Sequence, residues 1–351
     1  MTKFNPLRAG TSRRGLLRTS ALGGVVGLGL ADALGATPAS AAVGSATADS
    51  AGDRLVMLGV DGGPKVNVGR AKPALALVVE DQVYLVDAGA NTADQLVAAG
   101  LGFATLNHLF LTHHHLDHTS GLMGLLIHGW TYAPSALTGL RMWGPPQMGR
   151  FTRGLEAGYG DGIDLYENGG GFSAFPDVRT TDVRVPHASA RSQPVARVME
   201  DDLVRVDATR VFHGDEVKDA YAYRFTVKSS RKKVVFSGDT NAPNRALIAL
   251  AKDADYLVHE TQDNDNVEKV VASAPAAQQA ALREHLLTSH SDVRDLPRVG
   301  RAAGVGTMVM SHYTPLPQDA SVYLKKAQRA ADRLGYDGAL VAPEDLDVIA
   351  L

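Results

Sequence analysis

The sequence predicts an α/β protein built as a four-layer αββα sandwich, in which two β-sheets pack face to face and helices cover their outer faces. Three observations support this class. Strand, loop and helix patterns alternate up to about residue 150, short β-like runs dominate residues 178–239, and the alternation returns in the last third. Hydrophobic residues make up 45% of the chain and charged residues 21%, which is enough apolar material for a large core.

In the first half, apolar runs at 55–60, 74–81, 83–90 and 106–112 are expected to be strands. A tight turn at residues 80–82 joins the second and third. Helical spacing predicts helices over 91–100, which ends on Gly100, and over 122–130. The Gly-rich stretch 154–172 is expected to form loops that cover a site.

In the second half, strands are expected at 204–213, 220–229, 232–240, 256–261 and 307–313, with a final strand in either 338–343 or 345–351. Helices are expected over 267–285, 292–303 and 321–334. The helix over 267–285 is interrupted at Pro275. It could be the face of a homodimer or a lid, although an ordinary amphipathic surface helix is the simpler interpretation.

The N-terminal residues have the pattern of a targeting segment. Arg13 and Arg14 precede a mildly apolar stretch over 21–34, and small residues at 39–41 suggest a cleavage site. This order resembles a twin-arginine export signal. We therefore expect a signal peptide at 1–42, a linker at 43–53 and a single hydrolase domain at 54–351. The twin-arginine export machinery would be a partner, and the cleaved protein would be soluble in the periplasm or outside the cell.

The cysteine content limits the metal ligands that the chain can offer, and the net charge limits the partners it can bind. The chain has no cysteine, so any metal must be bound through nitrogen and oxygen. Without residues 1–42 the chain has 30 basic and 37 acidic residues, a formal charge of −7. Such a charge is unfavourable for binding a polyanion, so no stable nucleic acid partner is expected.

Residues 109–121 read LFLTHHHLDHTSG and hold the strongest functional signal. The pattern His113-x-His115-x-Asp117-His118 follows an apolar strand. Alternate side chains of a loop can converge on one metal ion, while Asp117 and His118 turn toward a second. Imidazole nitrogen and carboxylate oxygen are ligands that zinc accepts. His114 lies between two ligands and is expected to point away from the metals.

This HxHxDH motif resembles the signature of the metallo-β-lactamase-fold hydrolases. The resemblance continues in order through YLVDAG (Asp87), RVFH (His213), SGDT (Asp239) and MSHY (His312), and covers residues 55–350. It implies two divalent metal ions, zinc in the first place and manganese or iron as alternatives. One ion would be bound by His113, His115 and His213, and the other by Asp117, His118 and His312. Asp239 would bridge them, and Asp87 would support the ligand loop.

Two further motifs resemble the ribonuclease Z branch of this fold. His259-Glu260 ends a strand, and His290 lies in a loop before a helix. The resemblance implies that His290 donates a proton to the leaving group and that Glu260 orients it, with Asp117 as the third catalytic residue. His259 is expected to be a core residue. The N-terminal half, with RMWGPP at 141–146, resembles exported arylsulfatases of the same fold.

Together these motifs predict an exported dinuclear-zinc hydrolase of small phosphate or sulfate esters. A metal-bridging hydroxide would be its nucleophile. A lactonase or β-lactamase-type hydrolase is an alternative. Processing of tRNA 3′ ends is less favoured, because the chain is acidic and lacks a long basic arm. A metal-storing protein without activity is also less favoured, because no ligand of the motif set is missing.

Overall fold

The computed structural model describes residues 43–45, 52–133, 136–189, 191–316 and 318–351. The expected signal peptide at 1–42 lies outside these residues. The described residues belong to one compact unit. None of the helices in the described part of the chain combines the length and the apolar character needed to cross a bilayer.

The first sheet has eight strands in the order β1-β15-β2-β3-β4-β5-β6-β7. They are β1 (Val43–Ser45), β2 (Arg54–Gly59), β3 (Ala74–Val79), β4 (Gln82–Val86), β5 (Leu106–Phe110), β6 (Arg141–Gly144), β7 (Arg179–Asp182) and β15 (Asp347–Ala350). Part of the expected linker is therefore strand β1, which pairs antiparallel with β15. Every residue of β3 is buried, as its uninterrupted apolar sequence requires.

The second sheet has seven strands in the order β14-β13-β12-β11-β10-β9-β8. They are β8 (Ala196–Glu200), β9 (Val204–Val211), β10 (Ala220–Val227), β11 (Lys233–Phe236), β12 (Tyr256–Gln262), β13 (Thr307–Thr314) and β14 (Ala339–Val341). Strands β11 to β14 are parallel neighbours. Both candidates for the final strand form strands, because the chain crosses from the second sheet to the first between β14 and β15.

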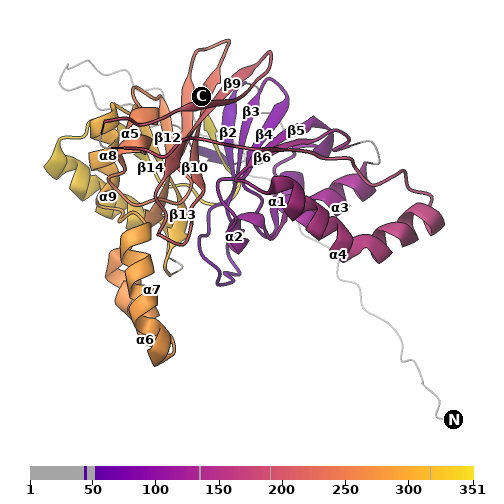
Figure 1. Cartoon of the computed structure of the whole chain (residues 1–351). Coiled ribbons are helices and arrows are strands. Elements are labelled where there is room, and N and C mark those ends of the chain that lie inside the picture. The colour runs from indigo at the N-terminus through magenta and orange to yellow at the C-terminus, as the bar shows by residue number, and fades with distance from the viewer. Residues whose placement is uncertain (1–42, 46–51, 134–135, 190, 317) are drawn as a thin grey trace, which may run out of the picture. The chain divides into compact units, whose positions relative to one another are not determined.

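The two sheets pack against each other through aromatic side chains. Phe110 of β5 stacks on Trp143 of β6 at 5.0 Å between ring centroids, and meets Phe225 of β10 edge-on, also at 5.0 Å. Figure 1 shows α1 (Thr92–Ala98), α3 (Leu122–Tyr132) and α4 (Met148–Gly169) on one side, and α5 (Arg245–Leu250), α8 (Leu296–Ala303) and α9 (Ala320–Leu334) on the other. The four-layer αββα sandwich predicted from the sequence is confirmed.

The expectation of loops at 154–172 is wrong, because most of this stretch belongs to helix α4. Apolar side chains recur there at helical spacing, and Met148, Phe151, Leu155 and Ile163 all pack on the core beneath the first sheet. This burial outweighs the low helix propensity of the glycines, each of which costs about 1 kcal/mol relative to alanine.

The segment after β12 forms a helical hairpin that projects from the body of the molecule (Figure 1). It consists of α6 (Val267–Ser273) and α7 (Ala276–Ser289), and Pro275 caps the start of α7. The expected interruption at Pro275 therefore divides two antiparallel helices. Val267, Val271 and Leu286 form a small apolar core between them.

Candidate metal centre

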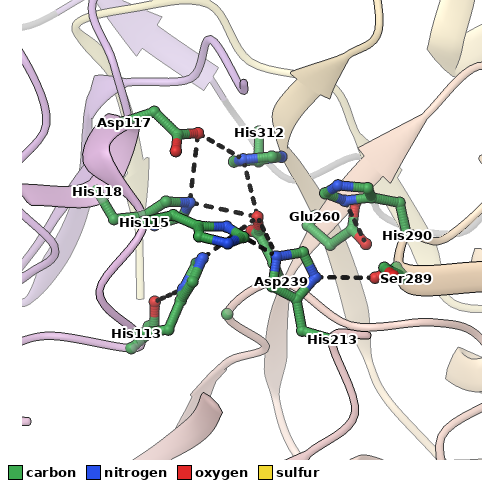
Figure 2. A network of polar contacts seen from close by, with 12 residues as sticks. His113, His115, Asp117, His118, His213, Asp239, Glu260, Ser289, His290 and His312 are labelled. Atoms are coloured by element: carbon green, nitrogen blue, oxygen red, sulfur yellow. Dashed lines mark hydrogen bonds and ion pairs between the residues drawn. The ribbon is translucent and has the colours of Figure 1, made fainter. Parts of the chain in front are cut away.

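All seven predicted metal ligands lie together where strands of both sheets end (Figure 2). His113 and His115 follow β5, and helix α2 (Leu116–Thr119) carries the next two ligands of the motif. The other ligands come from the second sheet: His213 follows β9, Asp239 follows β11 and His312 lies in β13. The strand order brings these distant segments together, because β9, β11, β12 and β13 run in the same direction and end, with β5, at the same edge of the sandwich.

The carboxylate of Asp239 lies at the middle of the group. Its Oδ2 atom is 3.1 Å from Nε2 of His312, 3.3 Å from Nε2 of His118 and 3.6 Å from Nε2 of His213. Among the seven predicted ligands, the ligand atoms within 4.8 Å of one another form two sets: one of His113, His115, His213 and Asp239, and one of Asp117, His118 and His312. This division is the one that the motif resemblance implies.

The buried nitrogen atoms fit a pair of divalent cations. Nε2 of His113 and Nε2 of His118 are buried and have no hydrogen-bond partner. A buried polar atom without a partner costs about 1–3 kcal/mol, and a metal ion would satisfy both. Burial, opposed by Asp239, holds the pKa of His113 well below its usual value, and in the same way lowers that of His213 to about 3. Both rings are therefore neutral, the form that binds metal.

Outer hydrogen bonds orient the ligand rings. Asp87 accepts the backbone N–H of Thr112 at 2.8 Å and lies 2.8 Å from Nδ1 of His118. Nδ1 of His213 donates to the carbonyl oxygen of Ser289 at 3.0 Å. The two contacts made by ring Nδ1 atoms turn Nε2 of His118 and of His213 toward the centre and fix the tautomers. Sequence reasoning found Asp87 but missed Thr112, whose hydroxyl also contacts Asp87 at 2.9 Å. It missed Ser289 because a backbone carbonyl acts there, and residue type carries no signal for it.

His290 and Glu260 lie beside the second ligand set, as Figure 2 shows. Nδ1 of His290 is 3.4 Å from Oε1 of Glu260, and the same oxygen accepts the Ser291 N–H at 2.8 Å. Burial and the charge of Asp239 raise the pKa of Glu260 to about 8, while burial lowers that of His290 to about 4. One nitrogen of His290 lies within 4.8 Å of ligand atoms of Asp239 and His312. The pair therefore adjoins the reacting position.

Two other histidines of the sequence motifs, His114 and His259, lie outside the ligand sets. His114 is exposed, and its Nε2 is 3.4 Å from the carbonyl oxygen of Pro146. His259 is buried in β12, and its Nδ1 is 2.7 Å from the carbonyl oxygen of Glu260. His114 thus points away from the centre, and His259 is a core residue.

A cavity of about 530 Å³ opens onto the centre. One wall is residues 62–65, and the opposite wall is the α6–α7 hairpin, which contributes Val270, Leu282 and Leu286. His285 of α7 also lines this cavity. The sequence placed it only on a surface helix, because nothing in its local pattern relates α7 to strands far away in the chain.

The chain is similar to several known proteins. Residues 82–313 match the family model described as Beta-lactamase superfamily domain. Ribonuclease Z of Mycolicibacterium paratuberculosis is 31% identical over 264 residues, which cover 74% of this chain and 86% of the relative. Ribonuclease Z of Thermoplasma acidophilum is 26% identical over 289 residues, with shares of 74% and 86%.

Two solved structures share the fold. The short form of human tRNase Z superposes with a TM-score of 0.58 at 19% identity, over 85% of this chain and 98% of that one. The metallo-beta-lactamase fold protein YhfI from Bacillus subtilis gives a TM-score of 0.59 at 16% identity, over 84% and 98%. At these identities the likeness concerns the fold alone.

Proposed function

The chain belongs to the beta-lactamase superfamily, and we propose that it is a metal-dependent phosphodiesterase that cleaves RNA as a ribonuclease Z does. Its sequence is about 30% identical to proteins of that name over most of both chains. The observation that carries the proposal is the His290–Glu260 pair, which lies next to the metal ligands: Glu260 comes from β12, and His290 follows helix α7.

The sequence-based expectation of a hydrolase for small phosphate or sulfate esters is wrong, while export stays a prediction. The relatives are named ribonuclease Z. We therefore prefer RNA processing, which was the less favoured alternative in the sequence analysis. The expectation relied on the resemblance of the N-terminal half to arylsulfatases, on the lack of a long basic arm and on the negative charge of the chain. Net charge is a weak guide here, because two divalent cations would add four positive charges where the scissile phosphate binds, and Lys65 lines the same cavity.

The two ligand sets define which residues would bind each metal ion. His113, His115 and His213 would hold one ion, Asp117, His118 and His312 the other, and Asp239 would contact both. Bound there, divalent ions lower the pKa of water toward neutrality and polarise the phosphate. The His118 ring is hydrogen-bonded to Asp87 and the His213 ring to the Ser289 carbonyl, and these bonds hold both rings in the orientation that metal binding requires.

The proposed role of His290 is to protonate the leaving oxygen. Glu260 occupies the Nδ1 side of the ring, which leaves Nε2 for the substrate. Cleavage of RNA expels a ribose alkoxide, which is strongly basic and needs a proton as the bond breaks. A proton donor at this position therefore suits a phosphodiester of a sugar.

The test is to incubate the zinc- or manganese-loaded protein with a tRNA precursor that carries a 3′ extension, and with nitrophenyl sulfate. We expect cleavage of the precursor near its 3′ end and no release of nitrophenol. Asp239→Ala should lose RNA cleavage, because both ligand sets converge on this carboxylate. Hydrolysis of the sulfate ester without cleavage of RNA would contradict the proposal.

A further inference from the structure

A histidine of the projecting hairpin, distinct from the predicted ligands and from His290, lines the metal cavity. His285 lies on α7, and its ring centroid is 5.6 Å from that of His213 and 5.5 Å from that of His290. Nitrogen atoms of these three rings lie within 4.8 Å of one another. The side chain is 28% exposed, so it remains accessible to a molecule in the cavity. No step described above uses it.

Glu216 holds the His285 ring in one orientation. Its Oε1 atom is 2.6 Å from Nδ1 of His285 and comes from the loop between β9 and β10. The loop turns at Gly214, whose φ is +82°, and a Cβ there would lie 2.6 Å from the Glu216 carboxylate. Glycine at this position therefore lets Glu216 reach across to α7.

This contact determines which nitrogen faces the cavity. The backbone N–H of Glu216 and the His285 ring hold the pKa of the Glu216 carboxyl below its usual value, so the group is ionised and can only accept. Nδ1 of His285 must then carry the proton. Nε2 is then the nitrogen turned away from Glu216, and in the neutral form of the ring it is a hydrogen-bond acceptor for a substrate donor such as a hydroxyl.

The wall around His285 is apolar. Val270, Leu282 and Leu286 line the cavity from the hairpin. The charged pair Arg283–Glu268 is exposed, joined at 2.7 Å between Nε and Oε1, and neither of its residues lines the cavity. Ser273 is the exception in this wall, and its hydroxyl donates to the Val270 carbonyl oxygen at 2.7 Å. A largely apolar wall that carries one imidazole suits a sugar with an attached base.

We propose that His285 accepts a hydrogen bond from the ribose 2′-hydroxyl of the nucleotide beside the scissile phosphate, while Leu282 and Leu286 contact its sugar and base. The inference rests on the proposed cleavage of RNA. The 2′-hydroxyl is the group by which proteins distinguish RNA from DNA. His285 adjoins His213, a predicted metal ligand, so the hydroxyl it reads belongs to a nucleotide next to the metal-bound phosphate.

The test compares two RNA substrates that differ by one atom, the 2′-oxygen of the nucleotide at the cleavage site. The wild-type enzyme should cleave the 2′-deoxy substrate about 5- to 10-fold more slowly, the effect of one hydrogen bond. His285→Phe should cleave both substrates at the same reduced rate, and His285→Gln, which keeps an acceptor, should restore part of the preference. Arg283→Gln, on the same helix but outside the cavity, should behave as wild type.

Metal content, measured by elemental analysis, is the second readout and should be the same in wild type and His285→Phe. If His285→Phe loses an equivalent of metal, His285 is a metal ligand and the inference is wrong. If this variant keeps the wild-type preference for the 2′-hydroxyl, the inference is also wrong, while RNA cleavage stands. A wild-type enzyme that binds metal but cleaves neither RNA instead refutes the proposed function and, with it, this inference.

Discussion

Asp87 and His118 lie 31 positions apart and are joined by a 2.8 Å contact between Oδ2 and Nδ1. Asp87 follows β4 and His118 lies in α2, and the parallel pairing of β4 with β5 brings the two segments together. Asp87 also accepts the backbone N–H and the hydroxyl of Thr112. One carboxylate thus fixes both the start of the ligand loop and the ring of a predicted ligand.

Asp87→Asn should weaken metal binding without unfolding the protein. Asparagine keeps the size of the side chain but has one acceptor oxygen, so it cannot serve Thr112 and His118 together. Loss of such an outer partner typically costs 10- to 100-fold in metal affinity. Titration of the metal-free protein with zinc measures this. An unchanged affinity would show that the ligand loop holds its shape without Asp87.

The ligand positions were predicted from the motif resemblance, which could be followed along the chain because each motif comes after an apolar run. Their spacing along the chain, from His113 to His312, then mirrors the order of strands in the two sheets. Helix α4 was not predicted, because its many glycines favour a loop in any reading of the local sequence. Its apolar side chains recur at helical spacing, but only their packing against the first sheet stabilises the helix.

The cavity wall was not predictable for a different reason. His285 reaches the centre because α7 folds back over the ligand cluster and Glu216 meets it from the β9–β10 loop. Local spacing gives no information on such a long-range contact. The same holds for Ser289, whose backbone carbonyl, not its side chain, contacts His213.

His290→Ala should affect substrates according to the basicity of their leaving group. A nitrophenolate leaves without a proton, so hydrolysis of bis-nitrophenyl phosphate should fall less than about 10-fold. A ribose alkoxide needs the proton, so RNA cleavage should fall about 100- to 10,000-fold. Single-turnover rates on the two substrates measure the difference. Equal losses on both would assign His290 to the ligand geometry and not to proton donation.

Removal of metal should lower the melting temperature. The cluster then leaves Nε2 of His113 and Nε2 of His118 buried without partners. A ligand at 1,000 times its dissociation constant stabilises the folded state by about 4 kcal/mol. For a domain of this size that corresponds to roughly 10 °C. Thermal melts with EDTA, and again after zinc is added back, test this. The matched control is His118→Ala, which should respond less to the chelator.

The acid sensitivity of the core should depend on His108, far from the metal ligands. Its ring stacks between Tyr84 and Trp143, at 5.2 Å from each. Burial, opposed by Asp201, lowers its pKa from 6.5 to about 4. Between these values the unfolded chain binds a proton that the folded chain does not, so the free energy of unfolding falls as the pH is lowered through this window.

His108→Phe keeps a flat ring between the two aromatic neighbours and removes the titrating group. Urea unfolding at pH 7.5 and pH 5 should show that the wild type loses about 2 kcal/mol more than the variant. The comparison between the two proteins cancels the acid sensitivity of the metal ligands, which they share. Parallel losses in both would mean that His108 is protonated in the folded protein at pH 5, paired with Asp201, whose Oδ2 lies 3.4 Å from Nε2.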